Sequence, residues 1–270
     1  MSVTAFDRTT ARNVSIRAVR DKLPAIIGVL ILLGIWWFGG FLLRTNPATR
    51  AFAGFAPAPA FAALIHLATT GALETAGIAS LARVAAGLVI AIVIGVPVGI
   101  AIGRIRVLKQ ATAIPFQFLR MISPLSWMPI AVLMFPGWNG AIIFLIVMAA
   151  VWPVIFATAN GVSKIDPAWL KVARNLRATP LQRLRAVILP AIAQDVMTGI
   201  RLALGVAWIV LVPAEYLGVS SGLGYAISDA RDTLDYPRLA AIVLTIGLIG
   251  FTLDSVCNFI IRRVGWQQEG

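Results

Sequence analysis

Residues 161–195 of the chain read GVSKIDPAWLKVARNLRATPLQRLRAVILPAIAQD, the longest polar interruption between apolar segments. Asp166-Pro167 is a helix start, because an aspartate side chain accepts free backbone N–H groups and proline suits the first helical position. Thr179-Pro180 repeats this signal further along, and the residue before a proline disfavours helix. The stretch therefore predicts two short helices, about 167–177 and 180–188.

Each predicted short helix has an apolar face, because apolar residues recur at helical spacing along it. They are Trp169, Ala173 and Leu176 on the first helix and Leu181, Leu184 and Ile188 on the second. The remaining faces carry the basic residues Lys171, Arg174, Arg177, Arg183 and Arg185. Two interpretations fit such a hairpin. It rests on anionic lipid head groups, which attract Lys and Arg side chains, or it docks on a protein partner.

The composition excludes an ordinary soluble protein. The 270 residues are 59% hydrophobic and 13% charged, with a mean hydropathy of +0.89, which is typical of an integral membrane protein. Cys257 is the single cysteine, so no intrachain disulfide forms, and the single histidine, His66, offers no cluster of metal ligands. The phosphate-binding loop G-x-x-x-x-G-K-[ST] does not occur, so the chain carries no ATPase site of that type.

Six apolar segments are long enough to cross a membrane, since about 20 helical residues at about 1.5 Å each span a hydrocarbon core of roughly 30 Å. They are 24–43, 80–103, 112–135, 141–160, 196–217 and 238–261, the third broken at Pro124 and Pro129. The sequence therefore predicts an all-α integral membrane protein with six transmembrane helices. No small-residue cleavage site follows a short apolar core, so the first span is expected to remain as an anchor.

Basic residues are distributed unevenly around these spans. Most of the 23 Lys and Arg residues lie in four segments, 1–23, 104–110, 161–195 and 262–270. Such residues mark cytoplasmic loops, because they resist translocation. Both termini and the 161–195 hairpin are therefore expected in the cytoplasm. This placement accounts for the net charge of +12 without nucleic acid as a partner.

The stretch from Lys171 to Pro190, KVARNLRATPLQRLRAVILP, resembles the EAA loop of the membrane subunits of bacterial ABC importers. The family pattern is roughly E-A-A-x3-G-x9-I-x-L-P. The positions that match are Ala173, Val187, Leu189 and Pro190, and those that depart are Lys171, Val172 and Arg177. The resemblance implies a coupling-helix hairpin that docks on an ATP-hydrolysing subunit. It implies these ATPase-coupling residues: Trp169, Lys171, Ala173, Arg174, Leu176, Arg177 and Pro190.

Three further stretches resemble the subgroup of these permeases that serves nitrate, sulfonate, taurine and bicarbonate importers. They are TGIRLALGVAW at 198–208, PAEYLGVSSGLGY at 213–225 and RMISPLSWMP at 120–129, where Met121 and Ser123 depart from the subgroup's R-P-x-P-P-L-A-W-x-P. With the loop, the resemblance covers about residues 80–262. It implies a small anion as substrate, while organic cations and heterocyclic precursors, which related permeases carry, stay open.

The resemblance also implies an organisation and a set of partners. A cytoplasmic tail (1–23) precedes the first span and an extracytoplasmic loop (24–79), the ABC permease core follows (80–262), and a second cytoplasmic tail (263–270) comes last. The expected partners are a second permease copy forming a homodimer, two ABC ATPase subunits that hold ATP-Mg, an extracytoplasmic solute-binding protein and membrane lipid. The chain itself is expected to bind no cofactor and to catalyse no reaction. Its expected location is the bacterial inner membrane.

Arg120 lies within the third predicted span, where a charge is costly without a partner or water. Prolines nearby free backbone groups, which at membrane depth are tolerated only against protein or a water-filled cavity. One hypothesis is that Arg120 favours a small oxyanion in a translocation path. The residues assigned to that path are Arg120, Ser123, Ser126, Trp127 and Glu215. The alternative is that Arg120 pairs with Glu215 and only holds the third and fifth spans together.

Other residues of the spans have expected structural roles. Arg83 and Arg201 are expected to extend their charged ends toward the membrane surface, and the Gly222–Gly224 segment to form a turn. A function of another class, an ion-coupled secondary transporter, needs intramembrane carboxylates, for which only Glu215 and Asp254 are candidates. Dependence of transport on ATP separates the two classes.

Overall fold

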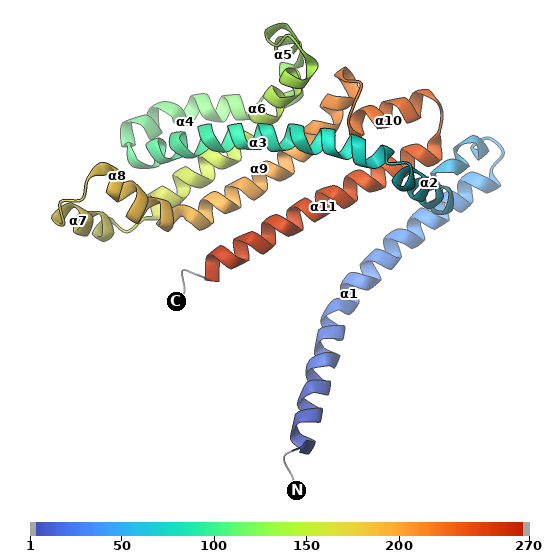
Figure 1. Cartoon of the computed structure of the whole chain (residues 1–270), viewed down its shortest axis with the longest axis horizontal. Coiled ribbons are helices and arrows are strands. Elements are labelled where there is room, and N and C mark those ends of the chain that lie inside the picture. The colour runs from blue at the N-terminus through green and yellow to red at the C-terminus, as the bar shows by residue number, and fades with distance from the viewer. Residues whose placement is uncertain (1–3, 267–270) are drawn as a thin grey trace.

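The computed structural model describes the backbone of residues 4–266 and the side chains of residues 23–263. That part of the chain is helical and contains no strand. Figure 1 shows the long helices α3, α6 and α9 packed alongside one another, with α11 against α9 and α1 diverging from them. In chain order the elements are α1 Thr4–Thr45, η1 Arg50–Phe55, α2 Pro57–Thr69, α3 Ala72–Arg104, α4 Arg106–Met121, η2 Pro124–Trp127, α5 Met128–Met134, α6 Trp138–Lys164, α7 Pro167–Asn175, α8 Pro180–Arg183, the π-helical turn η3 Leu184–Ile188, α9 Leu189–Gly218, α10 Leu223–Asp232 and α11 Tyr236–Trp266.

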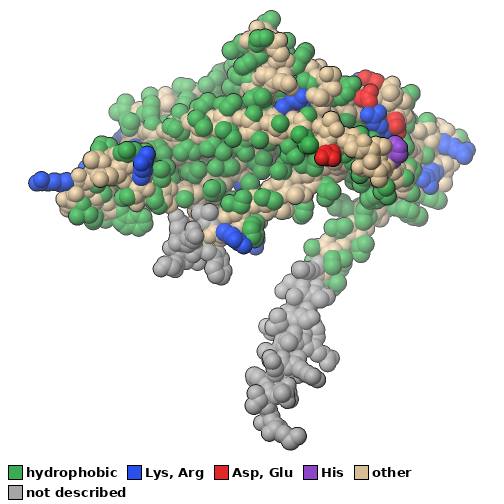
Figure 2. Space-filling model, in the orientation of Figure 1, with side chains coloured by type: hydrophobic (Ala, Val, Ile, Leu, Met, Phe, Trp, Pro, Cys, Tyr) green, Lys and Arg blue, Asp and Glu red, His purple; other side chains and the backbone are tan. Residues whose placement is uncertain are grey.

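Hydrophobic side chains cover most of the helix surface visible in Figure 2, as a bilayer requires. Five helical segments are long and apolar enough to cross a membrane: Leu23–Thr45, Ala72–Arg104, Trp138–Lys164, Pro180–Gly218 and Tyr236–Arg263. The pair Arg106–Met121 and Pro124–Met134, bent by 88°, makes a sixth when it is counted as one broken span. The protein is therefore a multi-pass, all-α membrane protein, as the sequence predicts.

The break in the third span lies at one of the two predicted prolines. Helix α4 ends at Met121, and Ser123 is extended because Pro124 disfavours the helical conformation of the residue before it. Pro129 causes no break, since it lies in the first turn of α5, where the missing N–H has no helical partner to lose. The predicted start at residue 112 was wrong, because α4 begins at Arg106.

The segments that join the first predicted span to the second and the fifth to the sixth contain helices. The segment 44–76 includes η1, α2 and the first residues of α3, which begins before the predicted residue 80. The segment 218–237 includes α10. These short helices lie at one end of the bundle, and the α7–α8 hairpin lies at the other (Figure 1).

The centre of the bundle is α6, which packs between α3 and α9. Glycines of α3 allow its backbone to approach α6, because a Cβ at Gly99 would lie 2.6 Å from the Cβ of Thr158 and one at Gly103 the same distance from the Cβ of Val162. On the other side of α6, a Cβ at Gly199 of α9 would likewise lie 2.6 Å from the Cβ of Ala157. Close backbone contact of this kind stabilises helix pairs in membranes, where lipid is as apolar as the helix surfaces.

The α7–α8 hairpin begins as predicted but ends differently. Asp166 accepts a hydrogen bond from the backbone N–H of Ala168 at 2.8 Å, and Thr179 forms a capping box with Gln182. The second helix was predicted to end at residue 188, whereas α8 runs through η3 into α9 without a break, with Pro190 in the first turn of α9. The second helix of the hairpin and the membrane helix α9 are therefore one continuous element.

The first hairpin helix also ends earlier than predicted, at Asn175 instead of residue 177. Arg177 then adopts a left-handed backbone with φ 54°. Glycine adopts this conformation without steric cost, whereas other residues pay for it in strain. The turn between α7 and α8 thus retains a glycine-type geometry although the chain has arginine there.

A buried ion pair joins α3 to α9 at the α10 end of the bundle. The guanidinium of Arg83 is paired with the carboxylate of Glu215, and their side chains are only 6% and 0% exposed. Glu215 also accepts hydrogen bonds from the hydroxyl of Ser80 at 2.8 Å and the backbone N–H of Gly224 at 3.0 Å. The expectation that Arg83 extends to the membrane surface was therefore wrong, and Glu215 is paired with Arg83 instead of Arg120.

Arg83 further ties the start of α6 and the loop between α9 and α10 to this pair. Its Nε donates to the side-chain oxygen of Asn139 at 2.9 Å, and Nη2 donates to the hydroxyl of Ser221 at 2.7 Å. Gly222 has a φ of 108° and faces the Glu215 carboxylate so closely that a Cβ would clash with it. The expected turn at Gly222 is thus present, and its glycine is required both by the backbone and by the buried carboxylate.

Replacing Glu215 by alanine is expected to destabilise the protein by about 3–5 kcal/mol, because it leaves the Arg83 charge buried without a partner. The measurement is thermal unfolding of the solubilised chain. Asp232→Asn is the matched control, since it removes an exposed ion pair with Arg231 and is expected to cost less than about 1 kcal/mol. Equal losses in the two variants would contradict the structural importance of the buried pair.

Candidate functional site

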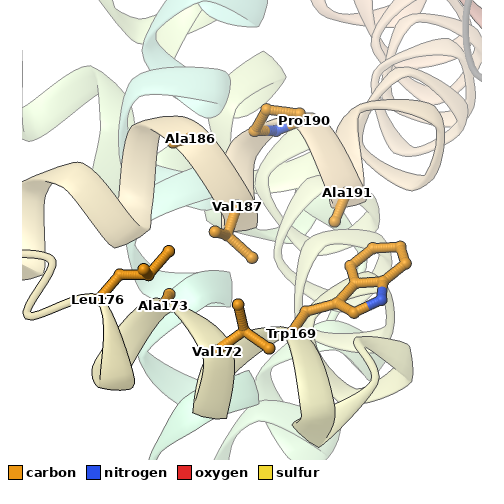
Figure 3. Close-up of a pocket in the computed structure, with 8 residues that line it drawn as sticks. All are labelled: Trp169, Val172, Ala173, Leu176, Ala186, Val187, Pro190 and Ala191. Atoms are coloured by element: carbon orange, nitrogen blue, oxygen red, sulfur yellow. The ribbon is translucent and has the colours of Figure 1, made fainter.

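An apolar groove of about 680 Å³ separates α7 from the start of α9. Figure 3 shows side chains of α7 on one side of it and those of η3 and α9 on the other. Its lining consists of Trp169, Val172, Ala173, Leu176, Ala186, Val187, Pro190 and Ala191. The lining residues of α7 recur at i, i+3, i+4 and i+7, which places them on one helix face.

The α7 side of the groove is lined by exposed apolar side chains. Leu176 is 76% exposed, and Trp169 and Val172 are each 57% exposed, whereas Ala173 is buried at the base. These side chains lie on a hairpin that projects from one end of the spans (Figure 1). An apolar surface of this kind marks a contact site for a partner or for membrane lipid.

Sequence reasoning found part of this groove. Of the expected coupling residues, four line it: Trp169, Ala173, Leu176 and Pro190. The three basic ones, Lys171, Arg174 and Arg177, are exposed but do not line it. Val172 and Val187 also line the groove but were not assigned a role. Val172 could have been found from its spacing, because it lies three residues after Trp169 on the same helix face, and Val187 because it matches the loop pattern.

A second pocket, of about 630 Å³, lies among the broken third span, α6 and α9. Arg120, Ile122 and Pro124 line it from the third span, and the polar residues Asn160, Asp195 and Thr198 line it from α6 and α9. The rest of the lining is mainly apolar and includes Trp152 and Phe156. The pocket is therefore an apolar cleft with a few polar groups, the usual character of small-molecule sites.

The two charged residues that line this second pocket, Arg120 and Asp195, differ in their partners. The Arg120 guanidinium lies over the Phe156 ring at 5.2 Å and has no salt bridge among the described residues. Asp195, in contrast, is held by Lys164 with an Nζ–Oδ1 distance of 2.8 Å. Of the two charged residues in the lining, Asp195 is thus paired with Lys164, which does not line the pocket, whereas Arg120 is paired with no carboxylate.

The other residues assigned to the path lie elsewhere. Ser123, Ser126 and Trp127 belong to the bend after Arg120 but do not line the second pocket, and Trp127 packs against the hydrophobic core. Glu215 is fully buried in the ion pair with Arg83. The structure therefore brings only Arg120 of the five into this pocket.

A third pocket, of about 650 Å³, lies at the opposite end from the hairpin and is more polar. Asn139 and Ser221, which contact Arg83, form part of its wall together with Ser220 and Tyr225. Arg201, expected to reach the membrane surface, instead forms a two-point ion pair with Asp254 of α11, with both N–O distances 2.7 Å. Among the side chains of residues 23–263, no group of three or more His, Cys, Asp or Glu residues could hold a metal ion.

Comparison with known proteins agrees with this architecture. The family model of the binding-protein-dependent transport system inner membrane component matches residues 91–266. The nitrate import permease protein NrtB of Leptolyngbya laminosa is 33% identical over 253 residues, which cover 92% of this chain and 89% of the relative. The bicarbonate transport system permease protein CmpB of Synechococcus elongatus is 41% identical over 194 residues, which cover 71% of this chain and 67% of the relative.

A probable ABC transporter permease protein of Brucella abortus is 32% identical over 243 residues, which cover 90% of this chain and 96% of the relative. Among solved structures, the inward-facing MetNI methionine ABC transporter has a similar fold, with a TM-score of 0.59 and 18% identity over 71% of this chain and 95% of that one. The family model, the relatives and the fold agree, and the chain belongs to the binding-protein-dependent transport system inner membrane components, the permease subunits of ABC transporters.

Proposed function

We propose that this permease carries a small anion, of the nitrate, bicarbonate, alkanesulfonate or taurine type, inward across the bacterial inner membrane. Two copies form the path, and two separate ABC ATPase subunits bind ATP-Mg and drive the transport, while an extracytoplasmic solute-binding protein delivers the anion. The chain itself binds no cofactor. Similarity to nitrate and bicarbonate permeases supports an anion as substrate.

The proposed orientation places the α7–α8 hairpin and both termini in the cytoplasm, in keeping with the basic residues around the spans. Residues 1–23 and 263–270 then form cytoplasmic tails, 24–79 the first span with an extracytoplasmic loop, and 80–262 the permease core. The hairpin at 161–195 is the part of the core that an ATPase can reach from the cytoplasm.

The apolar groove is the observation that supports coupling to an ATPase. Burying an exposed Leu or Trp side chain stabilises a complex by about 1.5–3 kcal/mol, and the groove has three large apolar side chains more than half exposed. Docking of an ATPase segment into the groove, with the basic residues around its rim, satisfies both sets of groups.

The unpaired Arg120 is the observation that supports an anion path. Arg120 is exposed and has no carboxylate partner among the described residues, so its guanidinium is available to an oxyanion, and an arginine guanidinium matches the geometry of planar oxyanions. Glu215 is proposed to keep the outer end of the bundle closed through its ion pair with Arg83, without lining the path. Ser123, Ser126 and Trp127 are proposed to shape the bend that presents Arg120.

Transport then follows from a two-state change. ATP binding draws the two ATPase subunits together, the docked hairpins move with them, and the paired permeases alternate their opening. Such a change requires that ATP bind one arrangement more tightly than the other. The permease contributes movement and a charged path.

Replacing Leu176 by aspartate is expected to lower ATP-dependent anion uptake at least about tenfold, because a charge on the exposed wall of the groove opposes burial against an ATPase. The measurement is uptake into vesicles that contain the chain with its cognate ATPase and binding protein, together with co-purification of the ATPase. Leu181→Asp is the control, since Leu181 is 54% exposed in the same hairpin but does not line the groove. Normal coupling in the Leu176 variant would refute the docking surface.

Replacing Arg120 by glutamine is expected to lower uptake of the carried anion about tenfold or more while leaving the assembled complex intact, because Arg120 pairs with no carboxylate in the described structure. Labelled nitrate, bicarbonate, taurine and an alkanesulfonate form the test panel. Arg120→Lys keeps the charge and is expected to keep part of the uptake. Loss of the folded complex would indicate a structural role, and uptake without ATP would return the secondary transporter as the explanation.

A further inference from the structure

A smaller pocket of about 390 Å³ lies along α4, on the side that faces α6 and the end of α3. Its α4 wall is one helix face on which the polar residues Lys109, Thr112, Gln117 and Arg120 alternate with the apolar residues Ala113 and Phe116. Asn160 and Ser163 of α6 form the opposite polar wall. The sequence placed Lys109 only in a basic loop, because the helical start of α4 was not predicted.

The charge of this α4 pocket is purely positive. Lys109 and Arg120 line it, and no described residue in its lining is acidic. The nearest carboxylate of the adjoining cleft, Asp195, is occupied by Lys164. An anion that moves along the α4 pocket therefore meets a cation near each end and no acidic residue in the lining.

Hydrogen-bond donors in the α4 pocket are available to a ligand. The hydroxyls of Thr112 and Ser163 donate to the backbone oxygens of Leu108 at 2.7 Å and Ala159 at 2.9 Å. The side chains of Lys109, Gln117 and Asn160, in contrast, have no hydrogen-bond partner within the described part of the chain. Ammonium and amide N–H groups are the donors that an oxyanion accepts from.

The α4 pocket is continuous with the cleft assigned to transport. Arg120, Phe156 and Asn160 line both of them. Lys109 precedes Arg120 by three turns of α4, or about 16 Å along the helix axis at about 1.5 Å per residue. An anion that leaves Arg120 toward the start of α4 thus passes the amides of Gln117 and Asn160, and then Phe116 and Ala113, before it reaches Lys109.

We propose that Lys109 forms a second oxyanion-binding site at the end of the α4 pocket opposite Arg120, reached past the side chains of Gln117 and Asn160, through which the anion leaves the cleft on the cytoplasmic side. The site rests on the proposed function, since that function fixes which end of α4 is cytoplasmic. A lipid phosphate offers the same chemistry as a free oxyanion. Continuity with the transport cleft favours the free anion as the occupant.

The test is nitrate binding to the complete importer in nanodiscs, at low ionic strength and without the binding protein, measured by calorimetry. Lys109→Gln is expected to weaken nitrate binding about tenfold, because it removes a charge-assisted hydrogen bond. Arg106→Gln is the matched control. It removes the same charge from the same helix outside the pocket, and it is expected to change the affinity less than about twofold if only local contacts matter.

Equal weakening in the two variants, or none in the Lys109 variant, overturns the proposal. The source of the oxyanion is separated by repeating the titration in discs of phosphatidylcholine alone and in discs with phosphatidylglycerol. A free-anion site gives the same Lys109-dependent affinity in both. The opposite result is that nitrate binding is lost in phosphatidylglycerol discs but kept in phosphatidylcholine discs, and that Lys109→Gln removes this difference. That result assigns the site to lipid and overturns the exit role.

This outcome is independent of the proposed function as a whole. If the wild type shows ATP-driven uptake and the Lys109 variant binds nitrate normally, the second site is refuted and the proposed permease function is retained. If nitrate binding depends on Lys109 but uptake does not depend on ATP, the second site is supported and the proposed ATP-driven transport is refuted.

Discussion

The bundle depends on close backbone contact between α6 and its two neighbours. In a bilayer, apolar side chains gain little by leaving lipid for protein, so helix association needs van der Waals contact at short range. Gly99 and Gly103 of α3 and Gly199 of α9 provide it, since a side chain at any of them would collide with α6. The positions of the Arg120 cleft and of the α4 pocket follow from this three-helix unit, because α6 forms a wall of each.

Polar contacts complete the same unit at its two ends. Arg83 and Glu215 connect α3 and α9 at the α10 end, deep enough that water is excluded. Lys164 and Asp195 connect α6 and α9 at the hairpin end, where the pair is partly exposed. A buried ion pair resists separation, because either charge left buried without its partner costs much free energy. An exposed ion pair contributes little to stability. The hairpin end is therefore the more easily opened of the two.

Local features of the sequence predicted local structure well. Asp166 and Thr179 marked the helix starts in the hairpin because capping depends on residues a few positions away. The partner of Glu215 could not be predicted in this way, because Arg83, Arg120 and Arg201 all lie in or near spans and only tertiary packing decides among them. The start of α4 was missed because Arg106 and Lys109 gave the segment the composition of a loop, although one face of it is helical in spacing.

The groove was half predicted for a related reason. The spacing of Trp169, Ala173 and Leu176 identified the α7 wall. The opposite wall depends on η3, where a π-helical turn replaces the expected end of the helix, and proline patterns alone do not indicate such a turn. Pro190 marked a boundary in the sequence but lies inside a continuous helix in the structure.

That continuity has a mechanical consequence. The segment Pro180–Gly218 is a single helical rod of 39 residues, about 58 Å long at about 1.5 Å per residue. One end carries Val187 of the groove, the middle carries Thr198 of the cleft, and the far end carries Glu215. A tilt of the hairpin is therefore transmitted along this helix to the groove, the cleft and the buried ion pair. The helix can bend at η3, where the regular α-helical hydrogen-bond pattern is interrupted.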